Sequence, residues 1–374
     1  MRQLSIKDYD FRLVFLVLLL TVLGIIAVGS AKESVQNKQI MGAAMGFILM
    51  IIISVIDYNF VLKFYWGYYI LNMVFLVLVT TSIFGSDSHG AQRWINLFGI
   101  TFQPSEPAKI FLILFFAQFL HRNAKKFKSF LFYVFCFVLI LIPVYEIHEQ
   151  PDLSTSIVVM VVFAVMMFVS GFDLRFLLGT VAVIVPTAII ILYLILQPDS
   201  SILEDYQKNR ILAFLNPTAA EYVNDDAYQQ NNSVMAIGSG QLLGKGYSQG
   251  EVNSVQGGGF ISEPQTDFIF AVIGEEWGFI GASAIIILLF AIALECAFVA
   301  KRASNLAGKL LACGVSAMIG FQGFMNLAVC TQLMPVTGLT LPFVSYGLTS
   351  LISCYAGIGF VLNVRLQGKQ IRAN

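Results

Sequence analysis

One aspartate carries the clearest chemical signal in this sequence. Asp267 lies in the segment SEPQTDFIFAVIGEE (262–276), directly before an apolar stretch that predicts a helix. Phe268 and Phe270 would partly exclude water, which raises the pKa of a carboxylate towards the working pH of a general base. The position equally suits a carboxylate at a helix N-terminus, stabilised by the helix dipole, with Thr266 as the cap. The residues alone leave both interpretations open.

A second group of charged residues lies in the segment GAQRWINLFGITFQPSEPAK (90–109). Lys109 falls in the first turn of a predicted helix, where the dipole disfavours a cation, so it needs a partner. Glu106, three residues earlier, is the nearest candidate for an ion pair. Alternatively, Arg93 and Lys109 line a site for an anionic group such as a diphosphate, which would fit a lipid-linked phosphate at the outer membrane face.

Other polar residues have simpler structural interpretations. Asp152, in the segment QPDLST (150–155), starts a predicted helix after a proline, so capping is its first expected role. Gln322 and Asn326 are four residues apart on one helix face and are most simply hydrogen-bonding partners between helices.

Composition predicts the elements that must position these residues. Of 374 residues, 57% are hydrophobic and 12% are charged, whereas soluble domains are about 25% charged. The apolar residues fall in runs of roughly 17–25, long enough to cross a bilayer core of about 30 Å as helices. We predict an all-α polytopic membrane protein, one integral-membrane domain over residues 1–374, with ten transmembrane helices at 13–30, 40–56, 65–84, 107–121, 129–147, 153–171, 174–197, 279–300, 307–331 and 345–363.

Several classes of site are disfavoured by composition. The net charge is zero, so the chain lacks the basic signature of a nucleic-acid-binding protein. The five cysteines lie in apolar runs and form no CxxC motif, so they are expected to be small buried hydrophobic residues. The three histidines are scattered, and no metal-ligand cluster is visible in the sequence.

Charge patterning predicts the topology. Lys and Arg concentrate in the loops that lie on the same side of the membrane as the N-terminus, most clearly in HRNAKKFK (121–128). Such loops are typically cytoplasmic, which places both termini in the cytoplasm. The long polar region 198–266, between the seventh and eighth helices, is then extracellular. It contains Arg210, Lys245 and the glycine-rich segment AIGSGQLLGKG (236–246), whose amides could approach a phosphate or form a structured turn.

The segment that follows this loop is too long for one crossing. Asp267 to Ala300 is 34 residues, about 50 Å as a helix. Either the helix projects from the membrane or it breaks near Gly274 and Gly278. Both solutions place Asp267 at the outer side, which avoids the cost of a carboxylate at the bilayer centre.

Seven segments in order resemble the SEDS family of elongasome, divisome and sporulation polymerases (RodA, FtsW and SpoVE). They cover nearly the whole chain: GAQRWI (90–95), FQPSEPAK (102–109), QPDLST (150–155), NRILAFLNP (209–217), AIGSGQLLGKG (236–246), TDFIFAVIGEEWG (266–278) and PVTGLTLPFVSYG (335–347). Three departures from the family pattern are Ser154 in place of a glycine, SYGLTS (345–350) in place of SYGGSS, and Gln241 where a third glycine often lies. The motif AQRW (91–94) favours the RodA branch of the family.

The resemblance implies a specific activity. Members of this family are lipid II polymerases, peptidoglycan glycosyltransferases that join disaccharide-pentapeptide units carried on undecaprenyl diphosphate. The family's essential acidic residue maps onto Asp267, which would deprotonate the acceptor hydroxyl as it attacks the anomeric carbon with inversion. The resemblance also implies a class B penicillin-binding protein as the partner transpeptidase, and a role in cell-wall elongation, division or sporulation.

The cationic residues of the matching segments are then expected to act on the diphosphate. Arg210 and Lys245 rank first because they lie in motifs of the large loop, followed by Arg93 and Lys109. Substrate binding is expected to extend to three further residues: Glu106, Asp152 and Ser345. No cofactor is certain, although a divalent cation (Mg²⁺ or Mn²⁺) could assist at the diphosphate.

Two other functions compete with polymerisation. A flippase for the same lipid-linked precursor would also use broken helices and cationic residues, but its site should lie near the membrane midplane. A non-catalytic scaffold for the class B penicillin-binding protein needs no particular carboxylate, so a neutral Asp267→Asn substitution would favour it.

Overall fold

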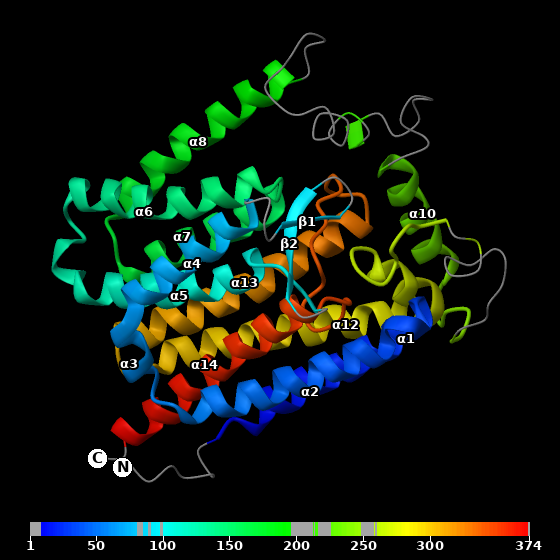
Figure 1. Cartoon of the computed structure of the whole chain (residues 1–374), viewed down its shortest axis with the longest axis horizontal. Coiled ribbons are helices and arrows are strands. Elements are labelled where there is room, and N and C mark those ends of the chain that lie inside the picture. The colour runs from blue at the N-terminus through cyan, green and yellow to red at the C-terminus, as the bar shows by residue number, and fades with distance from the viewer. Residues whose placement is uncertain are drawn as a thin grey trace.

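The computed structural model describes residues 9–80, 85–88, 91–97, 100–195, 212, 214–215, 226–247, 258 and 260–372. Long helices form a bundle and dominate the fold (Figure 1). They are α1 (Phe11–Ala31), α2 (Glu33–Val55), α4 (Tyr65–Thr80), α5 (Ser105–Arg122), α6 (Phe130–Glu149), α7 (Leu153–Ser170), α8 (Leu174–Ile195), α12 (Ile269–Arg302), α13 (Leu306–Cys330) and α14 (Leu348–Arg372).

Short elements connect or flank these helices. They are α3 (Tyr58–Val61), the 3-10 turns η2 (Leu62–Phe64) and η3 (Ala124–Lys126), α10 (Asp226–Ser239), and the strands β1 (Gly85–Ser88), β2 (Ala91–Leu97) and β3 (Ile100–Phe102). The strands form an antiparallel sheet in the order β1-β2-β3. This small sheet, between α4 and α5, is a feature that the sequence analysis did not predict.

The helical class of the fold is confirmed. Each predicted span overlaps one long helix, and eight helices in the described part of the chain are long and apolar enough to cross a membrane. The helix α5 contains three charged residues, Glu106, Lys109 and Arg122, and is not one of the eight. The chain is a multi-pass membrane protein, while a total of ten crossings stays a prediction.

The core of the bundle lies around α13, which packs against α5, α7, α12 and α14. The two ends of the chain meet at one end of the bundle. Asp10, the N-cap of α1, forms an ion pair with Arg365 near the end of α14. The opposite end carries α10 and the start of α12, and we call it the α10 end (Figure 1).

The helix α12 is broken, as one of the two predicted solutions required. Gly278 has φ +63° and ψ −163°, which is not helical, so α12 consists of a short part before this residue and a long part after it. Glycine adopts positive φ without the steric cost that a side chain would add. The kink at Gly278 coincides with the predicted start of the eighth span at residue 279.

Candidate active site

Asp267 lies at the α10 end, two residues before α12 begins, and is half-buried. Its backbone carbonyl accepts hydrogen bonds from Asn326 Nδ2 at 2.7 Å and Cys330 Sγ at 3.4 Å, both on α13. The predicted cap is wrong: the N-cap of α12 is Phe268, with no side-chain capping bond, and Thr266 donates to the Glu263 carbonyl instead. The aspartate is therefore held through its backbone, by the neighbouring helix.

The segment between α13 and α14 lies beside this carboxylate. Gly338 has φ +72°, and a Cβ added there would lie 3.6 Å from Asp267 Oδ2. Asn326 Nδ2 also donates to the Leu339 carbonyl at 2.7 Å, so one amide group ties both Asp267 and this segment to α13. The glycine is exposed and leaves the space next to the carboxylate without a side chain.

Ser345 belongs to the same assembly but faces the backbone. Its hydroxyl donates to the Thr266 carbonyl at 2.6 Å and accepts from Leu341 N at 2.7 Å. The amide of Tyr346 adds a bond to the Gln265 carbonyl at 2.8 Å. Ser345 is buried, so it fixes the segment that leads into Asp267.

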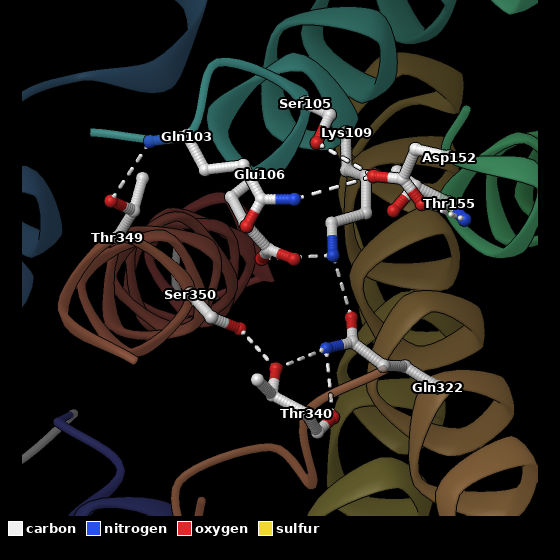
Figure 2. A network of polar contacts seen from close by, with 10 residues as sticks. All are labelled: Gln103, Ser105, Glu106, Lys109, Asp152, Thr155, Gln322, Thr340, Thr349 and Ser350. Carbon is white, nitrogen blue, oxygen red and sulfur yellow. Dashed lines mark hydrogen bonds and ion pairs between the residues drawn. The ribbon is translucent and has the colours of Figure 1, made fainter. Parts of the chain in front are cut away.

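The predicted ion pair between Glu106 and Lys109 is confirmed. Lys109 Nζ lies 2.9 Å from Glu106 Oε2 and donates to Gln322 Oε1 at 2.7 Å, and the lysine is 2% exposed. Gln322 Nε2 in turn donates to the carbonyl and the hydroxyl of Thr340. Figure 2 shows the Lys109 amine pointing between Glu106 and Gln322, in the interior of the bundle.

Asp152 caps α7, as predicted, and it also joins two helices. Its Oδ1 accepts from Thr155 N at 3.1 Å, while Oδ2 accepts from Ser105 Oγ at 3.1 Å and Gln103 Nε2 at 3.3 Å (Figure 2). The first turns of α5 and α7 are therefore fastened to each other. Asp152 is 4% exposed and its oxygens are occupied by protein donors.

Lys245 pairs with a carboxylate on α12. Its Nζ lies 2.7 Å from Glu275 Oε1, and its amide donates to the Glu275 carbonyl at 3.0 Å. The amide of Gly246 donates to the Glu276 carbonyl at the same distance. These two amides are thus satisfied by backbone carbonyls, which contradicts a phosphate cradle there and confirms the structured turn.

The glycines of this turn are required by close approach of two backbones. A Cβ on Gly240 would lie 2.0 Å from the Gly274 carbonyl oxygen, and one on Gly244, which has φ +80°, would lie 2.1 Å from that of Glu276. Gln241 has φ +50°, a conformation that favours glycine. This geometry gives a physical reason for a third glycine at that position.

Two predicted cations cannot be placed. Arg210 lies outside the described residues, and so does the side chain of Arg93, although its backbone belongs to β2. Among the described residues, no group of three His, Cys, Asp or Glu side chains could hold a metal ion. The divalent cation stays an expectation.

The structure brings together Asp267 and Ser345 at one place and Glu106, Lys109 and Asp152 at another. The two places are connected along α13, where Asn326 faces Asp267 and Gln322 faces Lys109. Sequence reasoning singled out this pair of amides but not their partners. It did not single out the other polar residues of the network: Gln103, Ser105, Thr155, Thr340, Thr349 and Ser350. The available signal was that Gln103, Ser105 and Thr340 lie inside matching segments, while Ser350 ends the departing segment SYGLTS.

A broken helix and buried polar networks at one end of an apolar bundle define an integral membrane protein with a built polar site, which transporters and membrane-embedded transferases share. Comparison with known proteins narrows this class. The model of the family described as "Cell cycle protein" (FtsW/RodA/SpoVE) matches residues 10–370. The chain belongs to the FtsW/RodA/SpoVE family.

Named relatives support this assignment. The chain is 33% identical over 377 residues to a probable peptidoglycan glycosyltransferase FtsW of Geobacter sp. (strain M18), covering 97% of this chain and 99% of the relative. It is 32% identical over 365 residues to the peptidoglycan glycosyltransferase MrdB of Escherichia coli (strain K12), covering 97% and 95%. These identities do not separate the branches of the family.

A solved structure shares the fold as well. A chain from a peptidoglycan synthase complex, described for the structural coordination of polymerisation and crosslinking, is 30% identical with a TM-score of 0.78. The match covers 97% of this chain and 99% of that one.

Proposed function

We propose that this protein is a peptidoglycan glycosyltransferase that polymerises lipid II at the outer face of the cytoplasmic membrane, with Asp267 as the general base. The observation that carries the proposal is the placement of Asp267: a half-buried carboxylate at the α10 end, beside the exposed and side-chain-free Gly338. A sugar hydroxyl needs this kind of access, because a general base must come within hydrogen-bond reach of the proton it removes. Relatives with the same enzyme name support the reaction.

The surroundings of Asp267 suit a base that must stay in position. Asn326 binds the backbone carbonyl of Asp267, and Ser345 binds that of the preceding residue. The backbone from which the carboxylate extends is therefore fixed in position. The acceptor hydroxyl would lose its proton to Asp267 while its oxygen forms the new bond to the anomeric carbon. The bond from that carbon to the diphosphate breaks, and the undecaprenyl diphosphate leaves with the electron pair.

The predicted cationic residues differ in how accessible their side chains are to the diphosphate of the substrate. Lys109 is buried in an ion pair, so its role in substrate binding is proposed to be indirect, through the network that shapes the site. Lys245 is about one-third exposed and can reach a diphosphate if it exchanges Glu275 for the substrate oxygen. Arg93 and Arg210 remain proposed ligands of the leaving diphosphate.

The location of the polar groups favours this function over a flippase, and the Asp267→Asn variant tests it against a scaffold. The half-buried carboxylate and the paired Lys245 both belong to the α10 end, whereas a flippase site is expected near the midplane. We further propose that both termini are cytoplasmic, since the Asp10–Arg365 pair joins them at the end opposite α10. A class B penicillin-binding protein is the proposed partner, supported by the likeness to a chain from a complex that couples polymerisation to crosslinking.

The experiment that tests the proposal is polymerisation of labelled lipid II by the purified full-length chain, with and without the partner. Asp267→Asn keeps the shape of the side chain but cannot accept the proton, so we expect the glycan ladder to vanish while the variant remains monodisperse. Thr266→Ala is the matched control, because its hydroxyl only bonds the Glu263 carbonyl. A ladder of equal strength from Asp267→Asn would reject the base, and no ladder from wild type with the partner would reject the polymerase.

A further inference from the structure

The turn that follows α10, residues 240–247, is fixed at a defined level of α12. The Gln241 carbonyl accepts from Phe279 N at 2.8 Å, and the Leu242 carbonyl accepts from Ile280 N at 3.2 Å. Phe279 and Ile280 are the first residues after the break at Gly278. Amides at a helix start have no partner within their own helix, so the turn caps the long part of α12.

This turn presents two leucines outwards. Leu242 is 59% and Leu243 is 76% exposed. Exposed apolar residues continue directly below them on α12, beginning with Phe279 and Ile280 and extending to Ile287 and Phe290. In a membrane protein such a stripe faces lipid, and the two leucines extend it by one step beyond the start of the helix.

The length of α12 determines how deep the turn lies. Phe279 to Arg302 spans 24 residues, about 36 Å at 1.5 Å per residue. This exceeds the hydrocarbon core of about 30 Å. With Lys301 and Arg302 at one headgroup region, Phe279 reaches the opposite one. Trp277 and the exposed Tyr247 lie next to this level, and these two residue types are enriched at membrane interfaces.

We propose that Leu242 and Leu243 form an interfacial anchor that inserts into the lipid headgroup and acyl boundary of the membrane at the α10 end. The anchor holds residues 240–247 at a constant height, together with the Lys245–Glu275 pair that follows it. The occupant is lipid, because the leucines continue the lipid-facing stripe of α12 and the backbone bonds to Phe279 and Ile280 fix their depth. The inference does not depend on the reaction that the protein catalyses.

The experiment measures depth with an environment-sensitive fluorophore. Leu243→Cys is labelled in the full-length chain, in a Cys313→Ser background because the other four cysteines are buried. The protein is reconstituted alone in phosphatidylcholine and phosphatidylglycerol vesicles. Two matched controls are labelled in the same way: Ile287→Cys in the middle of α12, and Tyr228→Cys in the first turn of α10. Both control positions are exposed.

We expect blue-shifted emission from Leu243→Cys, strong quenching by lipids that carry a doxyl group near the headgroup, and weak quenching by aqueous iodide. Ile287→Cys should respond more to doxyl groups deep in the acyl chain, and Tyr228→Cys mainly to iodide. A second label at Leu242→Cys should reproduce the result and guards against local distortion by the dye.

Three results would overturn the inference. Red-shifted emission with iodide quenching equal to that of Tyr228→Cys would place the turn in water. Protection from both lipid and aqueous quenchers would mean that protein covers the leucines, for example a second copy of this chain. Deep quenching equal to that of Ile287→Cys would place the turn inside the hydrocarbon and not at the interface.

Discussion

Breaking the buried pair between Glu106 and Lys109 should destabilise the bundle strongly. The two charged atoms are 2.9 Å apart, and the side chains are 5% and 2% exposed, respectively. At an effective dielectric constant of about 20, the Coulomb attraction at this distance is about 6 kcal/mol before desolvation is subtracted. Removing one partner leaves the other charge buried and uncompensated, which typically costs about 3–5 kcal/mol.

The test is equilibrium unfolding in mixed micelles with a denaturing detergent, followed by circular dichroism. Glu106→Gln and Lys109→Met should each lower the free energy of unfolding by about 3–5 kcal/mol. The double variant should lose about 2–3 kcal/mol less than the two losses added together, because it removes the unpaired charge. Lys32→Met is the matched control: its partner Glu263 is 3.6 Å away and both side chains are about half exposed, so its loss should be about 0–1 kcal/mol.

Losses from the single variants as small as that of Lys32→Met would refute this reasoning. They would show that Glu106 and Lys109 reach water, or that Gln322 compensates for either missing partner. Losses that simply add in the double variant would equally contradict coupling between the two charges.

Two further predictions concern the backbone around the site. Gln241→Gly should raise the free energy of unfolding by about 1 kcal/mol, because glycine adopts the positive φ there without strain. The same unfolding assay measures this change. A lower free energy of unfolding would show that the glutamine side chain stabilises the fold by more than the strain costs. Asn326→Leu should slow polymerisation by about 100-fold, since displacement of a catalytic group by about 1 Å has effects of this size. The lipid II assay at a temperature where the variant stays folded checks it, with Ser316→Ala on the same helix as control, and equal loss in both would indicate a general packing defect.

The departures from the family pattern have local explanations in the structure. Ser154, in place of a glycine, donates a hydrogen bond to the Thr337 carbonyl and so fastens α7 to the segment before α14. Thr349, in SYGLTS, accepts from Gln103 N at 3.3 Å. Leu348 lies against Gly42 of α2, where an added Cβ would come within 2.5 Å of the leucine. Ser154 and Leu348 therefore make side-chain contacts that glycine could not make, whereas the bond to Thr349 uses a hydroxyl that serine also has.

The sequence by itself determined the helices and the contacts that are close along the chain. Helix positions follow from apolar runs matched to the bilayer. The excess length of residues 267–300 left two solutions, a projecting helix or a break at a glycine, and the structure decided for the break at Gly278. The Glu106–Lys109 pair and the Asp152 cap were predictable because their partners are three residues apart. Local geometry alone fixes such contacts.

Only the tertiary structure decided which helices and loops share a site. Asp267 meets Asn326 across 59 positions, Ser345 meets Thr266 across 79, and Lys109 meets Gln322 across 213. Nothing in local propensity or periodicity selects one distant partner over another. The glycine-rich turn shows the same limit, since its amides could serve a phosphate or a backbone. Because α12 approaches the turn to within hydrogen-bonding distance, amides of the turn donate to backbone carbonyls of α12.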